Sequence, residues 1–269
     1  MHPSDLWKRP KGRPLIMGIL NLTPDSFSDG GAYLSTNNAL KHAYHLLESG
    51  ADVIDIGGES SRPGSEPVSE EEEIKRVIGV IKELAPTIGI PISVDTTKPR
   101  VAELSLKAGA SIINDIGGLR NDDMMDVAIS HDAPAVIVHM HGTPKTFGTD
   151  MMEGDALTEI KKFLNERAEH AVGRGLDEKN IILDPGIGFG KNPEQDMMII
   201  QNSGWLGGGY PVLIGPSRKR FLSKHYPRME RDEATAAASG TAAENGAAIL
   251  RVHNVSAVVQ FLERRRSGL

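Results

Sequence analysis

Residues 91–115, PISVDTTKPRVAELSLKAGASIIND, contain the pattern that decides the fold of this chain. The apolar run 91–94 ends at the polar Asp95, and a helical segment separates it from the apolar run 111–113, which ends at Asn114. Short runs rich in Ile and Val that alternate with helices are typical of parallel strands, because such strands are covered on both faces. The pattern therefore predicts a strand, helix and strand unit of an α/β protein.

The same order of apolar run, polar end, loop and helical segment repeats along the whole chain. Strands are predicted at residues 15–20, 53–56, 91–94, 111–113, 135–138, 181–183, 212–214 and 248–252. Helices are predicted at residues 37–49, 69–85, 99–108, 122–131, 155–174, 193–203, 232–246 and 255–266. An open doubly wound sheet is the alternative, but even spacing over 269 residues favours closure. The sequence thus predicts a single-domain (β/α)8 TIM barrel.

No linker or change of composition divides the barrel. We predict an N-terminal extension at residues 1–14 and one barrel domain at residues 15–269. Ser69 precedes four glutamates, as expected of a residue that caps a helix N-terminus. Several helices are predicted to end at a glycine in the left-handed conformation, namely Gly50, Gly109 and Gly175.

The composition limits the classes of function. A content of 39% hydrophobic and 25% charged residues is that of an ordinary globular protein. The formal net charge of −6 argues against a nucleic-acid surface, which needs clustered Lys and Arg. The absence of cysteine excludes disulfides, thiolate nucleophiles and Cys-ligated metals. No apolar run approaches a membrane span or a signal-peptide core, so we expect a cytoplasmic protein without a membrane partner.

Polar residues follow all the predicted strands, at the ends where a (β/α)8 barrel carries its active site. In chain order they are Asn21, Asp55 with Glu59, Asp95, Asn114 with Asp115, His139 with His141, Asp184, Ser217 with Arg218 and Lys219, and Arg251 with His253. One polar strand end can simply cap the next helix or meet solvent. A complete ring is harder to attribute to capping, so we interpret it as the active site.

One part of the ring consists of acids and an amide. Asp95, Asn114 and Asp184 suit a flat heterocycle with a guanidine-like edge, because carboxylates accept N–H groups and an amide both donates and accepts. The alternative is that the two acids pair structurally with Lys219.

The glycine-rich stretch 184–191, DPGIGFGK, is neither a Walker loop nor a convincing dinucleotide-binding motif. Its glycines let the backbone approach a ligand closely, and Phe189 can stack on a ring. The same glycines can equally form ordinary turns. No Ser, His and Asp trio stands out in the sequence, so covalent catalysis has little support.

Cations gather at the last two strands and at Arg62 in the second loop. In a closed barrel the eighth strand neighbours the first, so Arg62, Arg251, His253 and Asn21 can converge. Arginine offers phosphate a planar fork of donors, which makes this sector a candidate anion site. An anionic ligand can also bring Mg²⁺, held through oxygen ligands such as Asn21.

Several long motifs resemble those of dihydropteroate synthases, from about residue 15 to the C-terminal helix. They are MGILNLTPDSFSDGG at 17–31, DIGGESSRPG at 55–64, SVDT at 93–96, INDI at 113–116, HMHGTP at 139–144, DPGIGFGK at 184–191, SRK at 217–219 and RVH at 251–253. The resemblance implies a transferase of folate biosynthesis that condenses 7,8-dihydropterin-6-ylmethyl diphosphate with 4-aminobenzoate, releasing diphosphate and forming 7,8-dihydropteroate. It also implies Mg²⁺ as cofactor, a homodimer and a target of sulfonamides.

The resemblance further implies roles for individual residues. The pterin ring would be held by Asp95, Asn114, Met140, Asp184, Phe189, Lys219 and Arg251. Diphosphate would be bound by Asn21, Arg62, Arg251 and His253, with Mg²⁺ on Asn21. The 4-aminobenzoate pocket would contain Phe27, Ser61, Pro63 and Ser217. Catalysis would involve Asp29, Asp95, Lys219 and Arg251 without a protein nucleophile.

Three positions depart from the usual motifs of this family. Ser61 replaces a Thr, His141 replaces a Gln and Asn254 replaces an Asp. Ser61 retains the hydroxyl but lacks a methyl group, so the aminobenzoate pocket can differ in its affinity for sulfonamides.

Two other functions are open on the sequence alone. A methyltransferase that passes a methyl group from a folate to a corrinoid protein shares the barrel, but its substrate has no diphosphate to explain residues 61–63 and 251–253. A non-catalytic pterin-binding protein would not need the intact Asp29, Lys219 and His253. We therefore expect the synthase reaction.

Overall fold

The computed structural model describes residues 5, 12–22, 31–60, 66–143, 146 and 149–267, with the side chains of the first helix from residue 36 onward. Its parallel strands are β1 (Leu15–Asn21), β2 (Val53–Gly57), β3 (Ile92–Asp95), β4 (Ile112–Asp115), β5 (Ala135–Val138), β6 (Ile181–Asp184), β7 (Leu213–Ile214) and β8 (Ile249–Val252). The ends of each strand lie within about two residues of the predicted ends. A difference of this size is the usual uncertainty of element boundaries.

The strands form a closed ring. Their hydrogen-bonded order is β6-β5-β4-β3-β2-β1-β8-β7, and a parallel bridge between Leu183 and Val212 joins the two ends. Across this seam the N–H of Leu183 donates to the carbonyl of Pro211 at 3.0 Å. Because β8 pairs with β1, the last strand neighbours the first. The prediction of a (β/α)8 barrel is confirmed.

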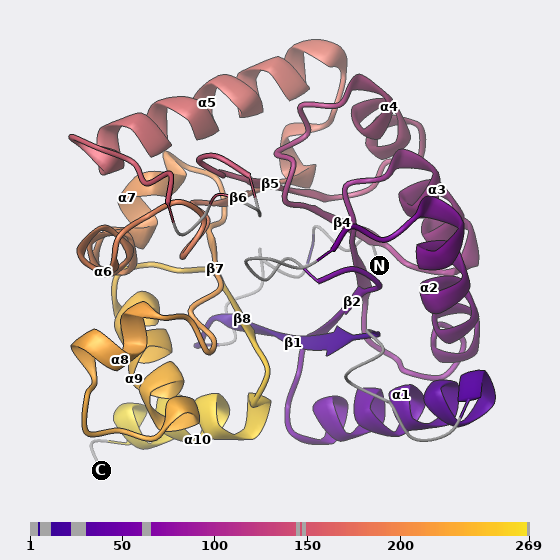
Figure 1. Cartoon of the computed structure of the whole chain (residues 1–269), viewed down its shortest axis with the longest axis horizontal. Helices are drawn as coiled ribbons and strands as arrows, with labels where there is room; N and C mark the ends of the chain where they lie inside the picture. Colours follow the sequence, from indigo (N-terminus) through magenta and orange to yellow (C-terminus); the bar gives the residue numbers. More distant parts are fainter. Residues whose placement is uncertain are drawn as a thin grey trace.

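Helices surround the ring on its outside (Figure 1). They are α1 (Gly31–Glu48), α2 (Glu70–Leu84), α3 (Pro99–Ala108), α4 (Asp122–Ser130), α5 (Ala156–Arg174), α6 (Pro193–Gln201), α7 (Ser203–Gly207), α8 (Phe221–His225), α9 (Arg231–Glu244) and α10 (Val255–Arg266), and a short 3-10 helix covers Glu178–Asn180. Within the described ranges, no helix is long and apolar enough to cross a bilayer.

Helical segments differ from the prediction at three places. Helix α1 begins at Gly31, six residues before its predicted start at residue 37. The helix expected at 193–203 is divided into α6 and α7, because Asn202 leaves the helical region with φ −124° and ψ 23°. The N–H of Gly204 then donates to the carbonyl of Asn245 at 2.7 Å, a contact that continuing α6 would not make. The short helix α8 has no counterpart among the predicted helices.

Helix ends follow the local signals in the sequence. Ser69 caps α2 by accepting a hydrogen bond from the N–H of Glu72 at 3.3 Å. Gly50, Gly109 and Gly175 have φ of 100°, 116° and 113°, as their places after α1, α3 and α5 predict. These left-handed values favour glycine, so the predicted helix ends are confirmed.

Two apolar layers position the site. The larger layer fills the space between strands and helices, and the smaller one lies inside the ring, with side chains from every strand except β3. In the inner layer Val53, Ile112, Ile182 and Ile249 are each followed two positions later by Asp55, Asn114, Asp184 and Arg251. Side chains two residues apart share one face of a strand, so these polar residues point into the ring just beyond the apolar layer.

Gly109 and Gly175 offer a matched test of packing at helix ends. A Cβ at Gly109 would lie 2.4 Å from the Cβ of Ala85, whereas no atom of the described residues lies within 4 Å of a Cβ at Gly175. Gly175→Ala should lower the free energy of unfolding by about 1–2 kcal/mol through its positive φ. In Gly109→Ala the free energy of unfolding should fall by a further ~1–3 kcal/mol, because the added methyl group overpacks the contact with Ala85. Urea unfolding of both variants measures the difference, and equal losses would contradict the close contact at Ala85.

Candidate active site

A cavity opens inside the ring where the strands end. Its wall is formed by Asp95, Asn114, Ile116, Val138, Asp184, Gly186, Ile187, Phe189, Gly215, Lys219 and Arg251. Six of the seven residues that the sequence assigns to a pterin site lie in this wall. The seventh, Met140, packs against the inner apolar layer instead.

Arg251 is held between two carboxylates of other strands. Its Nε donates to Oδ2 of Asp55 and its Nη2 to Oδ2 of Asp95, each at 2.6 Å. Asn114 donates from Nδ2 to the same Oδ2 of Asp55 at 3.1 Å. Asp55 is completely buried, and its Oδ1 has no hydrogen-bond partner among the described residues. The carboxylates therefore hold the guanidinium in place through two of its nitrogens.

The sequence places Asp55 in the polar ring but assigns it neither a substrate nor a catalytic role. The signal that could have revealed it is its spacing, because it follows the inward-facing Val53 by two residues and so faces the ring. Its partner Arg251 lies 196 positions away, and pairing over that distance depends on ring closure.

Burial changes the charges that the cavity wall carries. It raises the pKa of Asp95 to about 7, although the charge of Arg251 opposes this shift. It lowers the pKa of Lys219 to about 8, and Arg251 acts in the same direction. Burial also raises the pKa of Asp184, whereas a backbone hydrogen bond lowers it. Asp95 and Lys219 thus titrate near neutral pH, as functional groups often do.

Lys219 lies over an aromatic ring. Its Nζ is 4.3 Å from the centre of the Phe189 ring. Asp95 pairs with Arg251 instead of Lys219, and Asp184 accepts the N–H of Gly186 at 2.7 Å. Among the described residues, neither acid forms an ion pair with Lys219. The structural alternative is therefore not observed. The ammonium donors have no protein acceptor within the described ranges, so they suit a ligand.

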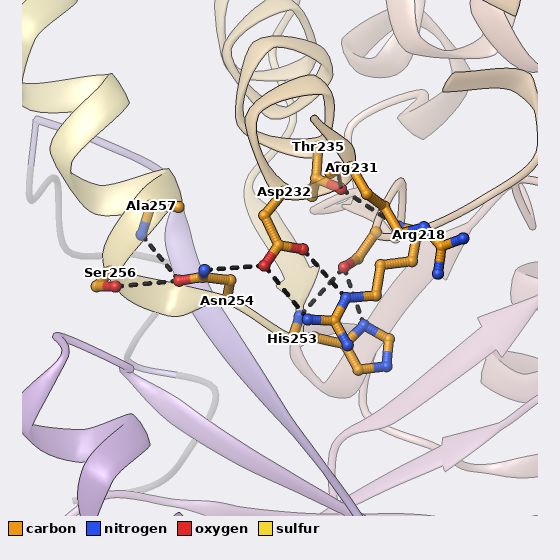
Figure 2. A network of polar contacts seen from close by, with 9 residues as sticks. Arg218, Arg231, Asp232, Thr235, His253, Asn254, Ser256 and Ala257 are labelled. Atoms are coloured by element: carbon orange, nitrogen blue, oxygen red, sulfur yellow. Dashed lines mark hydrogen bonds and ion pairs between the residues drawn. The ribbon is translucent and has the colours of Figure 1, made fainter. Parts of the chain in front are cut away.

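A second polar network joins the loops that follow β7 and β8 (Figure 2). Oγ of Ser217 lies 2.9 Å from Nδ1 of His253 and accepts the N–H of His253 at 3.2 Å. Arg218 donates to both carboxylate oxygens of Asp232 in α9, at 3.1 and 3.3 Å. Asn254 donates to the same carboxylate at 3.0 Å. Ser217 and His253, which the sequence assigns to different substrates, therefore touch each other.

Asn254 has two roles in this network. Its Oδ1 caps α10 by accepting the N–H of Ala257 at 3.1 Å, while its Nδ2 donates to Asp232. An aspartate here could cap the helix equally well, but it would place two carboxylates at hydrogen-bond distance. The departure from the usual motif thus matches the position of Asp232.

Asn21 lies at the end of β1 beside the wall. A Cβ at Gly57 would be 3.4 Å from Cβ of Asp95 and 3.8 Å from Oδ1 of Asn21, so the glycine leaves room between them. The remaining predicted site residues lie outside the described residues, namely Phe27, Asp29, Ser61, Arg62 and Pro63. The predicted convergence of Arg62 with Arg251 accordingly stays a prediction.

Some members of the polar ring have structural partners. Asp115 follows the inward-facing Asn114, so it points outward, where its carboxylate accepts two backbone N–H groups of the next turn at 2.7 and 2.9 Å. Glu59 forms an ion pair with Lys98. His141 lies 3.1 Å from Asp150 through Nε2. The cavity wall therefore contains fewer residues than the complete polar ring that the sequence predicts.

Comparison with known proteins places the chain in a family. A family model described as pterin binding enzyme matches residues 17–253. The dihydropteroate synthase of Bacillus subtilis is 48% identical over 255 residues, which cover 93% of this chain and 87% of that protein. This chain belongs to the dihydropteroate synthase family.

Solved structures of dihydropteroate synthases share the fold. That of Xanthomonas albilineans with 4-aminobenzoic acid has a TM-score of 0.88 at 40% identity, covering 95% of this chain and 93% of that chain. The same enzyme in complex with 7,8-dihydropteroate has a TM-score of 0.84 at 38% identity, covering 95% and 94%. The family resemblance of the sequence motifs is confirmed.

Asp55→Ala removes the buried partner of Arg251. We expect the free energy of unfolding to fall by about 3–5 kcal/mol, because Arg251 loses one of its two carboxylate acceptors and Nδ2 of Asn114 loses its acceptor. Asp122→Ala is the matched control, since it removes a carboxylate from an exposed ion pair with Arg174 at 2.8 Å. Such an exposed pair contributes at most about 1 kcal/mol to the free energy of unfolding. Guanidinium unfolding compares the two variants, and similar losses would show that Arg251 does not depend on Asp55.

Proposed function

We propose that this protein forms 7,8-dihydropteroate and diphosphate from 7,8-dihydropterin-6-ylmethyl diphosphate and 4-aminobenzoate. The reaction would take place in the cavity at the carboxyl end of the barrel. The observation that carries the proposal is a wall that brings Asp95, Asn114 and Asp184 together with Lys219 and Arg251 in the fold of dihydropteroate synthases. These groups match a ligand with a guanidine-like edge and an anionic tail.

The pterin is proposed to lie against Phe189 with its guanidine-like edge toward the acids. Asp95 and Asp184 would accept N–H groups of the ring. Nδ2 of Asn114 already donates to Asp55, which leaves Oδ1 as the acceptor for a further N–H. Lys219 would donate to an acceptor on the ring, and Met140 would border the pocket from the inner layer.

Diphosphate is proposed to bind near β1 and β8. Nε and Nη2 of Arg251 bond to carboxylates, so among the described contacts Nη1 is the nitrogen left for an anion. His253 and Asn21 complete this side, with Arg62 from the second loop. Cations at this place would hold the negative charge that the leaving group gains.

The donors near β1 fit Mg²⁺ only in company with the substrate. Asn21 supplies one amide oxygen, and no group of three His, Cys, Asp or Glu side chains within the described ranges could hold a metal. Mg²⁺ commonly keeps several waters and binds through one or two protein oxygens plus substrate phosphates. When bound, the ion would supply positive charge to the diphosphate.

The 4-aminobenzoate is proposed to bind beside Ser217, with Phe27, Ser61 and Pro63 from the first two loops. Because Ser217 contacts His253, the two substrate sites would meet at this pair. Sulfonamides, as analogues of 4-aminobenzoate, would compete for the same place.

The bond from the pterin methylene carbon to the diphosphate oxygen is proposed to break largely before the amine attacks. Its electron pair leaves with diphosphate, where Arg251 and His253 bind the developing charge. The carboxylate of Asp95 stabilises the cationic pterin, and Asp29 favours the cation that develops on the amine. The amine nitrogen then forms the C–N bond and releases a proton to solvent or diphosphate. No residue of the chain forms a covalent intermediate.

The homodimer, the cytoplasmic location and the domain limits expected from the sequence stay predictions. Arg13, near the end of the proposed extension, pairs with the buried Asp52 at 2.7 Å. Light scattering of the purified protein measures the oligomeric state directly.

The reaction is tested with purified protein, Mg²⁺, the pterin diphosphate and 4-aminobenzoate. We expect dihydropteroate and diphosphate in equal amounts. Lys219→Ala should weaken pterin binding by about tenfold or more, as expected for loss of a charged donor. Lys224→Ala removes an exposed lysine of α8 and should change neither binding nor turnover. Pterin binding by the wild-type protein without either product would contradict the synthase reaction.

Pterin binding is expected to depend on pH through Asp95. Burial raises the pKa of this carboxyl to about 7, so the charged form predominates above that pH and the neutral form below it. Affinity for 6-hydroxymethyl-7,8-dihydropterin should fall by up to about tenfold for each pH unit below about 7. This compound has no diphosphate, so calorimetry avoids the titration of that group. Asp95→Asn should bind the pterin weakly at every pH. If its affinity still fell with pH as steeply as that of the wild-type protein, the titration would belong to another residue.

A further inference from the structure

A buried lysine joins the two loops beside the cavity. Lys191 ends the stretch 184–191, and only 4% of its surface is exposed. Its Nζ lies 2.8 Å from Nδ1 of His139, 3.1 Å from the carbonyl oxygen of His139 and 2.9 Å from the carbonyl oxygen of Gly186. His139 follows β5, and Gly186 follows β6. The amino group therefore connects neighbouring loops from inside the protein.

The three acceptors match the three N–H donors of an ammonium ion. A neutral amine has two such donors, so one contact would be lost together with the proton. Burial and the charge of Lys191 lower the pKa of His139 to about 2, which keeps the imidazole neutral. Nδ1 of His139 can then accept from Lys191 while its own proton resides on Nε2.

The amino group of Lys191 titrates near neutral pH. Burial lowers the pKa of Lys191 to about 7, although Asp196 and Asp184 favour the charged form. The charge of Lys219, in the loop after β7, instead lowers the pKa of Lys191 further. A buried cation whose contacts are all neutral groups is costly, and such groups are retained more often at functional sites than elsewhere.

The stretch 184–191 runs directly along the backbone that follows β5. A Cβ at Gly186 would lie only 1.9 Å from the carbonyl oxygen of His139, and the φ of Gly186 is 71°. The N–H of His139 donates to the carbonyl of Asp184 at 2.8 Å, and the N–H of His141 donates to that of Phe189 at 3.3 Å. Asp184 and Phe189 line the cavity from this same stretch. A change in its position would therefore move two parts of the wall.

We propose that Lys191, as an ammonium ion, is a positioning residue for the pterin pocket. It holds the stretch 184–191 against His139 and so places the carboxylate of Asp184 and the ring of Phe189. Lys191 is not among the residues that form the described wall, so it acts through these two neighbours. The proposal rests on the proposed function for the identity of the ligand, a pterin, and for the KM values that test it.

Two variants separate the charge of Lys191 from its bulk. Lys191→Met keeps an unbranched apolar side chain but removes all donors, and Lys191→Gln keeps donors without the charge. We expect the KM for the pterin diphosphate to rise by about tenfold in Lys191→Met and by less in Lys191→Gln. The KM for 4-aminobenzoate should change by less than about twofold in both. Lys162→Met, at a largely exposed position of α5, is the matched control and should change neither value.

Two outcomes would overturn the proposal. An unchanged KM for the pterin diphosphate in folded Lys191→Met would show that the pocket does not depend on the lysine. An equal rise in both KM values, accompanied by a lower melting temperature, would assign Lys191 a general structural role.

The ¹⁵N spectrum of wild-type His139 provides a test that needs no variant. We expect an unprotonated Nδ1 and a protonated Nε2 near neutral pH. A proton on Nδ1 would overturn the proposal even if neither variant folds. This measurement and the binding of 6-hydroxymethyl-7,8-dihydropterin require no turnover. A protein with the expected spectrum that binds this pterin without forming dihydropteroate would therefore refute the proposed reaction and not the role of Lys191.

Discussion

Parallel pairing around a closed ring places the carboxyl ends of all the strands on one side of the protein. The bridge between β6 and β7 completes the ring, and the pairing of β8 with β1 brings Arg251 to Asp55 and Asp95. The register that buries Val53 and Ile249 also points Asp55 and Arg251 inward, because side chains two residues apart share a face. A slip of one residue would turn both the core and the site outward.

The cavity concentrates charge where burial makes charge unfavourable. Arg251 pairs with the carboxylates of Asp55 and Asp95, whereas Lys219 lies over the ring of Phe189. The pKa of Asp95 rises and that of Lys219 falls, because burial disfavours the charged form of each. A ligand with complementary donors and acceptors would relieve this cost. The wall is therefore better suited to recognising a polar heterocycle than to stabilising the fold.

Neighbouring loops are held together by separate polar networks. Lys191 joins the loops after β5 and β6 through His139, and Ser217 joins those after β7 and β8 through His253. Asp232 extends the second network into α9. Each network ties one pair of loops, and the contact of Lys219 with the ring of Phe189 lies between the two pairs. This arrangement places rigid contacts behind the groups that would meet substrate.

The sequence by itself determined the order and approximate limits of the strands and most helices, because apolar runs, caps and terminal glycines act locally. It also grouped Asp95, Asn114 and Asp184 in one site, because parallel strands end together. Only the tertiary structure decided that Arg251 pairs with Asp55 and that Lys191 contacts His139. It likewise decided that Gly204 bonds to Asn245, which accompanies the division of a predicted helix. Such contacts join residues far apart in the chain, and their geometry depends on ring closure and register that no local pattern contains.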